Sequence, residues 1–131
     1  MAQCHRRGVK VVPLVGPSSI ILSVMASGLN GQSFAFNGYL PVKEPDRSRA
    51  IKRYEARAMA ESQSQLFIEA PYRNAKLFEQ LLKTLAPTTL LTIAVDITAP
   101  SESIVTRPIA EWRKCSMPDI NKRPAIFVLG K

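Results

Sequence analysis

The sequence predicts an α/β fold, a layered α/β/α domain built around a mixed, partly parallel sheet of about five or six strands. Short apolar, β-branched segments alternate with helical patterns along the chain, as in proteins that pack helices on both faces of a sheet. The connection between residues 97 and 103 is short enough for a hairpin, so at least one strand pair should be antiparallel. Because no repeat or linker divides the 131 residues, residues 1–131 are expected to form a single domain.

The chain begins with a short helical pattern and an apolar segment. Residues 2–7 resemble the last turn of a helix, because basic residues lie near its C-terminal end and Gly8 follows as a C-cap. A helix this short does not nucleate alone, so we expect its earlier turns in a preceding segment. Residues 9–15 are mostly β-branched and apolar, which predicts a buried strand.

The next predicted element is a helix over residues 20–27. Ser18 or Ser19 is a suitable N-cap for this helix, and Gly28 marks its C-terminal end. Apolar side chains cover most of the helix circumference, so the sequence predicts that it is buried on nearly all sides.

The remaining elements follow from periodicity and from turn residues. The helix over residues 47–61 has only a thin apolar stripe, so most of its surface should face water. Strands are predicted where short apolar runs lie between turn residues. These strands are residues 33–40, 65–68, 90–97, 103–106 and 124–130, and the other predicted helices are the amphipathic segment before Pro87 and a turn at 109–114.

Composition and charge narrow the function classes. The chain carries 18 Lys and Arg against 10 Asp and Glu, a formal net charge of +8, so anionic partners such as RNA are favoured. No apolar run approaches the roughly 20 residues that a membrane span needs, so no membrane partner is expected. Two cysteines and one histidine are too few for a disulfide framework or for a metal site built from them, and they favour a cytoplasmic location.

Residues 15–20 are the most informative segment for function, because a predicted strand runs there through a tight turn into a helix. Ligands of open α/β sheets bind beyond the carboxyl ends of the strands. The free N–H groups at the start of the helix suit a carboxylate, a phosphate or a ribose. Plain capping by Ser18 or Ser19 explains the same residues without a ligand and stays open.

Two further groups of residues are candidates for binding. Glu69, Tyr72 and Arg73 place an acid, a phenol and a guanidinium at the end of a predicted strand, where such groups position hydroxyls or grip phosphates. Alternatively, Glu69 and Arg73 neutralise each other while Tyr72 packs. The basic helix around Arg53 is either an RNA contact, with Tyr54 available for stacking, or a solvated face.

Four segments together, in their order along the chain, resemble a known family. They are residues 8–20, 26–28, 34–41 and 67–73, which include the turn Gly-Pro-Ser-Ser and the run Phe-Ile-Glu-Ala-Pro-Tyr-Arg. The set is similar to the second half of the tetrapyrrole methylase superfamily. Within that superfamily it resembles the branch of bacterial ribosomal RNA small-subunit methyltransferase I, which methylates a cytidine ribose hydroxyl.

The resemblance implies a two-lobed methyltransferase that holds S-adenosylmethionine in the cleft between its lobes, needs no metal and assembles as a homodimer. Family members are much longer than this chain. The chain is therefore expected to be the C-terminal lobe, with the N-terminal lobe absent from these 131 residues. Such a lobe in isolation is expected to bind the cofactor weakly and to be inactive.

The residue patterns and the resemblance together give candidate residues. Glu69 or Tyr72 is the candidate base for a hydroxyl acceptor. Arg73 and Arg53 are the candidate substrate contacts. Tyr72 stands where a His is usual in the family, so the acceptor can differ from that of the relatives. The expected cofactor-binding residues are Ser18, Ser19, Ile20, Ile68, Val95 and Ile109, the last in a segment that borders the adenine in the family.

Three alternatives to an RNA methyltransferase stay open. The chain can be a basic α/β module that binds RNA without chemistry, and its binding would then fall steeply with salt and be indifferent to the cofactor. It can be a methylase of the same superfamily that acts on a small molecule. It can also act mainly as a dimer interface, which predicts a concentration-dependent dimer without ligand affinity.

Overall fold

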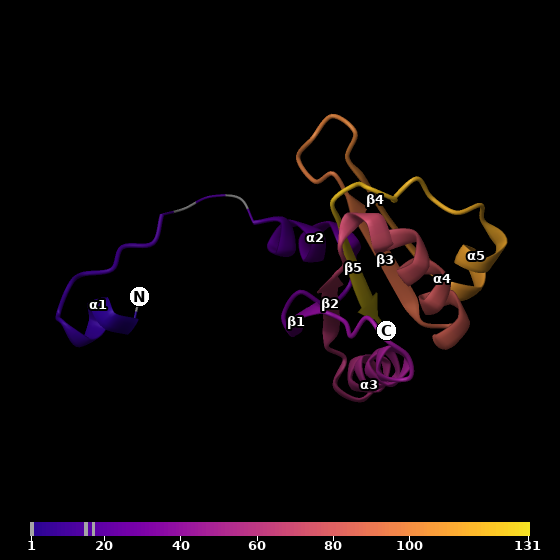
Figure 1. The fold of residues 1–131 in the computed structure, drawn as a ribbon, viewed down its shortest axis with the longest axis horizontal. Helices are drawn as coiled ribbons and strands as arrows, with labels where there is room; N and C mark the ends of the chain where they lie inside the picture. Colours follow the sequence, from indigo (N-terminus) through magenta and orange to yellow (C-terminus); the bar gives the residue numbers. More distant parts are fainter. Residues whose placement is uncertain (1, 15, 17) are drawn as a thin grey trace.

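A computed structural model describes residues 2–14, 16 and 18–131, and its core is one five-stranded sheet with helices on both faces (Figure 1). This confirms the α/β fold class. The strands lie in the order β1-β2-β5-β3-β4. They are β1 (Phe34–Tyr39), β2 (Ser64–Ile68), β3 (Leu90–Val95), β4 (Ser103–Pro108) and β5 (Ala125–Gly130).

The sheet is mixed, as predicted, and its last strand lies at its centre. β1 and β2 are parallel, whereas β5 is antiparallel to both β2 and β3. Phe127 of β5 lies opposite Phe67 on one side and Ile93 on the other. β3 and β4 form the antiparallel hairpin that the short connection predicts. Because β2 and β3 run in the same direction, both end at the edge of the sheet where β5 begins.

The two faces of the sheet carry separate apolar cores. The larger core contains Phe67 and Phe127, whose rings stack with centroids 5.9 Å apart, and Trp112, which packs edge-on against Phe78. The smaller core contains Val24, Leu66, Ala94, Ile126 and Val128. α2 (Ser19–Ser27) covers the smaller core, and α3 (Asp46–Glu61), α4 (Asn74–Thr84) and α5 (Ile109–Lys114) cover the larger one, while η1 (Pro71–Arg73) leads into α4.

The predicted strand over residues 9–15 is wrong. Residues 9–14 form no strand, and most of them are exposed, while Val15 lies outside the described residues. Together with α1 (Ala2–Arg6), they extend away from the sheet in Figure 1. A strand needs a neighbouring strand for its backbone hydrogen bonds, and residues 9–14 have none beside them, so β propensity alone does not produce one. The short helix before Gly8 is confirmed, and Gly8 has a φ of 71°.

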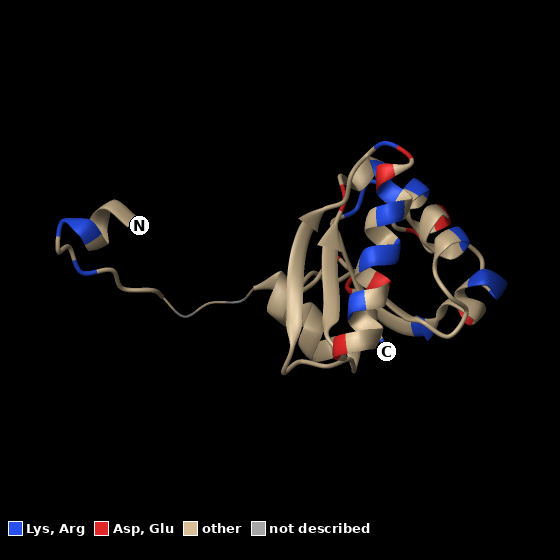
Figure 2. Ribbon diagram, turned by 90° about the horizontal axis from the view of Figure 1, so that it is seen from below, with Lys and Arg blue, Asp and Glu red and all other residues tan. Residues whose placement is uncertain are grey.

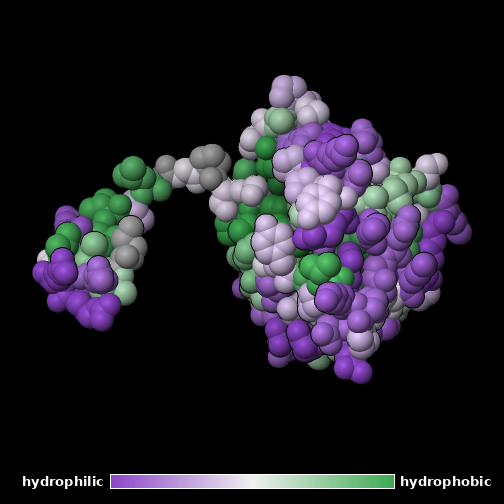
Figure 3. All heavy atoms as spheres, viewed as in Figure 1, coloured by the Kyte–Doolittle hydropathy of each residue, from purple (hydrophilic) through white to green (hydrophobic). Residues whose placement is uncertain are grey.

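The prediction that the helix at residues 20–27 is buried on nearly all sides is also wrong. The side chains of Ile21 and Met25 are 43% and 73% exposed. α2 packs one face on the sheet and leaves the other uncovered among the described residues, and Figure 3 shows hydrophobic atoms gathered on that side of the body. Gly28 ends α2 with a φ of 78°, as predicted.

The other predicted elements are confirmed with shifted ends. β3 stops at Val95, two residues earlier than expected, because Asp96 turns the chain with a φ of 50°. β4 extends further than expected, to Pro108. No helix among the described residues has the length and apolar character needed to cross a bilayer.

Candidate functional site

A cavity of about 460 Å³ lies at the edge of the sheet where β2 and β3 end and β5 begins. Small-molecule sites commonly occupy cavities of roughly 300–1,000 Å³ at such strand ends. The N-terminal end of α2 closes one side of the cavity, with Ser19 and Ile20 in its wall. Residues from several elements that are distant in the sequence therefore meet at one place.

The start of α2 offers backbone donors to this cavity. Ser18 occupies the N-cap position in an extended conformation, with a φ of −128°, but its side chain makes no capping hydrogen bond. The first-turn N–H groups of a helix have no partner within the helix, and they form a positive end of the helix dipole. Simple capping by Ser18 therefore does not account for this end of α2. Val15 and Pro17, in the predicted turn, lie outside the described residues.

The wall of the cavity is largely apolar. It is mainly the strand-end part of the smaller core, because Ile68, Ala94 and Ile126, which line it from β2, β3 and β5, pack on the sheet face that α2 covers. Strand residues alternate between the two faces of a sheet, so the sheet register decides which side chains reach this face. The apolar side chains of this wall include Ile20, Phe36, Ile68, Ala94, Ile97 and Ile126.

Glu69 supplies a buried carboxylate at the end of β2, with only 1% of its side chain exposed. Its Oε1 accepts hydrogen bonds from the Ala70 N–H at 2.7 Å and from Arg73 Nε at 3.1 Å. Its Oε2 is buried, has no hydrogen-bond partner among the described residues and lies 3.8 Å from Arg47 Nη2. The site therefore holds a buried carboxylate that is hydrogen-bonded through one oxygen and faces a guanidinium with the other.

The burial of Arg47 corrects the interpretation of the basic helix. The sequence placed Arg47 on a largely solvated helix, yet the residue is only 8% exposed. Its Nε and Nη2 are buried without a hydrogen-bond partner among the described residues. The ion pair with Glu69 is the reason that this position lies inside, and no pattern within α3 reveals it.

Asp96 is a second carboxylate at the cavity that sequence reasoning did not select as a site residue. Its Oδ2 accepts hydrogen bonds from Ser101 Oγ at 2.8 Å and from Arg123 Nε at 2.8 Å. These two bonds hold the pKa of Asp96 below its usual value of 3.8, so the side chain is ionised at neutral pH. Its position one residue beyond a buried strand was the available signal.

Comparisons with known proteins agree with this geometry. The ribosomal RNA small subunit methyltransferase I of Vibrio cholerae is 34% identical over 129 residues, which are 98% of this chain and 43% of that protein. The protein of the same name from Escherichia coli is 31% identical over 126 residues, 96% of this chain and 43% of that protein. This chain is a homologue of ribosomal RNA small subunit methyltransferase I. No family model matches the sequence.

The fold of this chain also occurs in solved structures of other proteins. The methyltransferase CobJ aligns with a TM-score of 0.59 and 17% identity over 99% of this chain and 54% of its own. The cobalt precorrin-4 methyltransferase CbiF aligns with a TM-score of 0.59 and 14% identity over 98% of this chain and 55% of its own. The sequence comparison confirms the resemblance to ribosomal RNA small-subunit methyltransferase I, and the solved structures show the shared fold. The chain spans less than half the length of the curated relatives that it matches.

The structure brings part of the predicted methyltransferase site together. Ser19, Ile20, Ile68 and Glu69 all line the cavity. Ser18 lies beside them at the N-cap of α2. Ser18, Ser19, Ile20 and Ile68 were expected from the resemblance, and Glu69 from its place at a strand end. They meet because the N-terminal end of α2 lies at the carboxyl end of β2.

The structure does not bring Val95 and Ile109 to this cavity. The Val95 side chain faces the larger core and lines a different cavity of about 380 Å³ with Arg107 and Trp112. Ile109 is fully buried at the start of α5, where its N–H donates to the Thr89 carbonyl at the opposite end of the sheet. On β3, Ala94 takes the position that was expected for Val95, because neighbouring strand residues face opposite sides.

The candidate substrate residues lie outside the cavity wall. Tyr72 is 63% exposed, and its hydroxyl accepts a hydrogen bond of 2.6 Å from Arg73 Nη1. The predicted neutralisation of Glu69 by Arg73 is present, but Tyr72 does not pack into the core. Arg53 is exposed on α3, with its guanidinium 5.2 Å from the centre of the Tyr54 ring. No group of three or more His, Cys, Asp or Glu side chains with metal-binding geometry occurs among the described residues.

Proposed function

We propose that the chain is part of an S-adenosylmethionine-dependent methyltransferase whose acceptor is a ribose hydroxyl of small-subunit ribosomal RNA. The observation that carries this proposal is the cavity at the strand ends, in which Ser19, Ile20 and Ile68 meet in a homologue of named ribosomal RNA methyltransferases. Methyl transfer from this cofactor depends mainly on alignment of the acceptor behind the methyl group. A rigid sheet edge is suited to that task.

The residues of the cavity fit the cofactor. The isoleucine side chains and Ala94 offer a flat apolar surface for an adenine ring, and the first-turn N–H groups of α2 suit a ribose oxygen or a carboxylate. Glu69 and Asp96 place negative charge near a ligand whose sulfonium and ammonium groups are positive. When bound, the cofactor supplies an activated methyl group, and the protein supplies binding and orientation.

Glu69 is the better of the two candidates for contact with an acceptor hydroxyl. A ribose hydroxyl is a weak nucleophile and benefits from a hydrogen-bond acceptor that draws on its proton. The Tyr72 hydroxyl is already bonded to Arg73 and is exposed to solvent outside the cavity wall, whereas Glu69 is buried and lines the cavity. We assign Glu69 the role of orienting the acceptor and Arg73 the role of holding Glu69 in place.

We further propose that a second lobe completes the cleft, as the resemblance implies. The curated relatives are more than twice as long as the part that this chain matches, since 43% of each is covered. Pairing of two such proteins as a homodimer stays a prediction of the family resemblance. Under this proposal the chain contributes one wall of the cofactor site and binds the cofactor weakly without the other.

The proposal is tested by titrating the isotope-labelled chain with S-adenosylmethionine and following amide signals by NMR. Weak binding at the cavity should shift the signals of Ser19, Ile20 and Ile68. Replacing Ile20, in the cavity wall, by Trp should weaken binding at least tenfold, because the larger ring occupies ligand space. The matched variant Ile21→Trp lies on the same helical turn but faces outward and should bind as the parent does.

Two results would contradict the proposed cofactor site. One is the absence of amide shifts at the cavity with millimolar cofactor. The other is equal loss of binding in the Ile20 and Ile21 variants, which would indicate a general effect of the added Trp. RNA binding that persists in the first case would favour the non-enzymatic RNA-binding alternative instead. Transfer of a labelled methyl group to unmodified small-subunit ribosomal RNA by the full-length protein tests the acceptor.

A further inference from the structure

We propose that the outer face of α3 contacts the sugar-phosphate backbone of the RNA substrate through Arg49, Arg53 and Arg57, which we call the arginine row. This inference rests on the proposed function, because it takes RNA as the acceptor. All three side chains are exposed. The arginine row is the surface that would guide the RNA to the cavity, and it lies outside the cavity wall.

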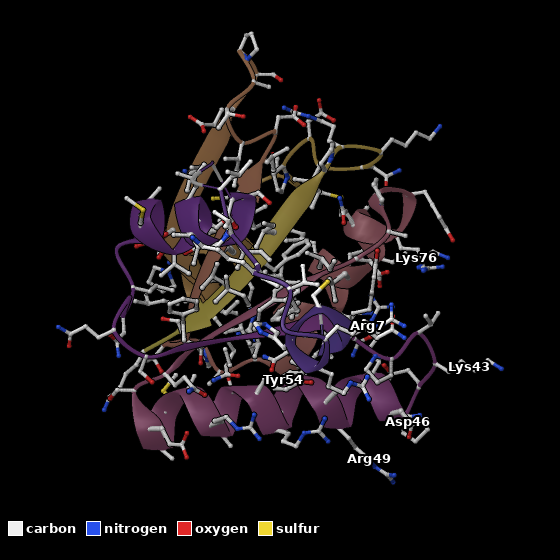
Figure 4. All side chains as sticks on the ribbon, turned by 90° about the vertical axis from the view of Figure 1, so that its left-hand side faces the viewer. Arg7, Lys43, Asp46, Arg49, Tyr54 and Lys76 are labelled. Carbon is white, nitrogen blue, oxygen red and sulfur yellow. The ribbon has the colours of Figure 1, made fainter. Side chains whose placement is uncertain are left out.

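The arginine row is produced by the helical repeat. Residues four apart on an α-helix lie on the same side, about 6 Å apart along its axis. The opposite side of α3 is anchored in the core by Ala50, Ile51 and Ala58, which are almost completely buried. In Figure 4 the Arg49 side chain points away from the sheet, on the other side of α3 from Tyr54. Because the opposite side of α3 is buried in the core, the arginine row stays on the solvent side of the helix.

The charges along the row are not balanced by neighbouring acids. Arg53, at its centre, has no acidic residue three or four positions away on α3. Asp46 stands three residues before Arg49 and Glu61 four residues after Arg57, at the two ends of the helix, and neither forms an ion pair with the row among the described residues. Like charges four residues apart on a helix repel each other. A polyanion bound along the row would turn this repulsion into attraction.

Other arginines of the chain are used differently. Arg113 donates hydrogen bonds to the Leu82 carbonyl, Arg123 pairs with Asp96, and Arg73 pairs with Glu69. These side chains hold the fold together, whereas the arginine row forms no side-chain hydrogen bond or ion pair within the described part of the chain, and its one contact is that of Arg53 with the Tyr54 ring. Tyr54 packs against the larger core, so it is less available for stacking on a base than the sequence indicated. The structure thus favours backbone contacts by charge over base contacts by stacking.

The arginine row begins at the end of α3 that contacts the candidate site. Arg47, two residues before Arg49, forms the buried ion pair with Glu69, and Glu69 lines the cavity. Figure 2 shows Lys and Arg recurring along the length of α3, starting from that end. Lys43 and Lys76 add exposed positive charge near the start of the row (Figure 4). An RNA strand lying on the row would therefore lead to the edge of the sheet where the cavity opens.

The test compares two variants that lose the same charge. The first replaces the arginine row by glutamine, as Arg49→Gln, Arg53→Gln and Arg57→Gln together. The control replaces three exposed lysines outside α3, as Lys83→Gln, Lys114→Gln and Lys131→Gln. Binding of each protein to an unmodified transcript of small-subunit ribosomal RNA is measured by filter retention between 50 and 200 mM salt.

Loss of three phosphate contacts should reduce the slope of log affinity against log salt by about 2, because each contact to a single strand contributes roughly 0.7. Between 50 and 200 mM salt the affinity of the parent should therefore fall by a factor about 20 times larger than the affinity of the glutamine variant. The lysine control should keep the slope of the parent. A third variant with Lys at all three positions of the row should also keep the slope, because it retains the charges.

The proposal is overturned if the glutamine variant and the lysine control have the same slope, since RNA would then respond only to net charge. Circular dichroism should show equal melting temperatures for both, as all six positions are exposed. Titration with S-adenosylmethionine separates this outcome from failure of the proposed function. A glutamine variant that keeps cofactor binding while losing salt-dependent RNA binding supports both proposals. If the parent protein binds RNA through the row but does not bind the cofactor, only the proposed methyl transfer is contradicted, and the proposed RNA contact stands.

Discussion

Glu69→Gln should destabilise the chain strongly, because it leaves a charged guanidinium buried without its partner. The Glu69 side chain is 1% exposed and that of Arg47 is 9% exposed. The substitution keeps the size of the side chain and still leaves an oxygen that accepts the Ala70 N–H. What is lost is the negative charge opposite Arg47 and Arg73. Arg73 is partly exposed to solvent, whereas Arg47 Nε and Nη2 are buried and have no hydrogen bond among the described residues.

The expected cost follows from the geometry of the pair. Two unit charges 3.8 Å apart interact by about 4 kcal/mol at an effective dielectric constant of about 20. Removing one member of a buried pair typically costs about 3–5 kcal/mol. Because this pair is not hydrogen-bonded, we expect the lower end, about 3 kcal/mol. For a domain of this size that corresponds to a fall in melting temperature of about 10 °C.

The double variant Arg47→Met with Glu69→Gln provides the decisive comparison. It removes the buried charge and the unpartnered donors together, and replacement of a buried ion pair by apolar groups is often nearly neutral. We therefore expect the free energy of unfolding of the double variant to lie within about 1 kcal/mol of that of the parent. Urea unfolding, monitored by circular dichroism, measures the free energy of unfolding of the parent, the two single variants and the double variant.

Two outcomes would refute this reasoning. A cost below about 1 kcal/mol for Glu69→Gln would mean that the pair is not a structural element of the fold. A double variant that is as unstable as the single one would mean that Glu69 acts through Arg73 and the backbone, and not through Arg47. In either case the link between α3 and the candidate site would have to be revised.

The remaining predictions concern acid stability and the close packing at the end of β5. Asp96 has a lowered pKa, so the stability that it contributes is complete above its unfolded pKa of about 3.9 and is lost as the pH falls through the lower folded value. Asp96→Asn should therefore be less stable than the parent near pH 6, and the difference should shrink below about pH 4 in urea unfolding at each pH. Gly130→Ala should cost about 1–2 kcal/mol, because its Cβ would lie 2.7 Å from Leu29 Cδ1. The double variant Gly130→Ala with Leu29→Ala should recover part of that cost, and no recovery would place the strain elsewhere.

Much of the fold is visible in the sequence because it depends on local patterns. The apolar spacing of α4, the glycine that ends α2 and the short apolar runs of β2, β3 and β5 are properties of neighbouring residues. Such signals persist in an isolated segment, so periodicity and turn residues predict them correctly. The alternation of these segments also predicted the α/β class and the β3–β4 hairpin.

Predictions that required a neighbour in space were less successful. Residues 9–14 have strand-like composition but no strand beside them, and α2 has an apolar outer side that nothing covers among the described residues. Arg47 has the spacing of a surface residue and is buried because Glu69 attracts it from another element. Composition cannot distinguish these cases, because burial is a property of packing.

The candidate site shows the same division. The sequence by itself determined that Ser19, Ile20, Ile68 and Glu69 belong to strand ends and to a helix start, where ligands are expected. Only the tertiary structure decided that Ala94 and not Val95 reaches the cavity, and that Ile109 lies at the far end of the sheet. A shift of one residue along a strand moves a side chain to the other face, so the sheet register and not the residue type decides what each strand contributes.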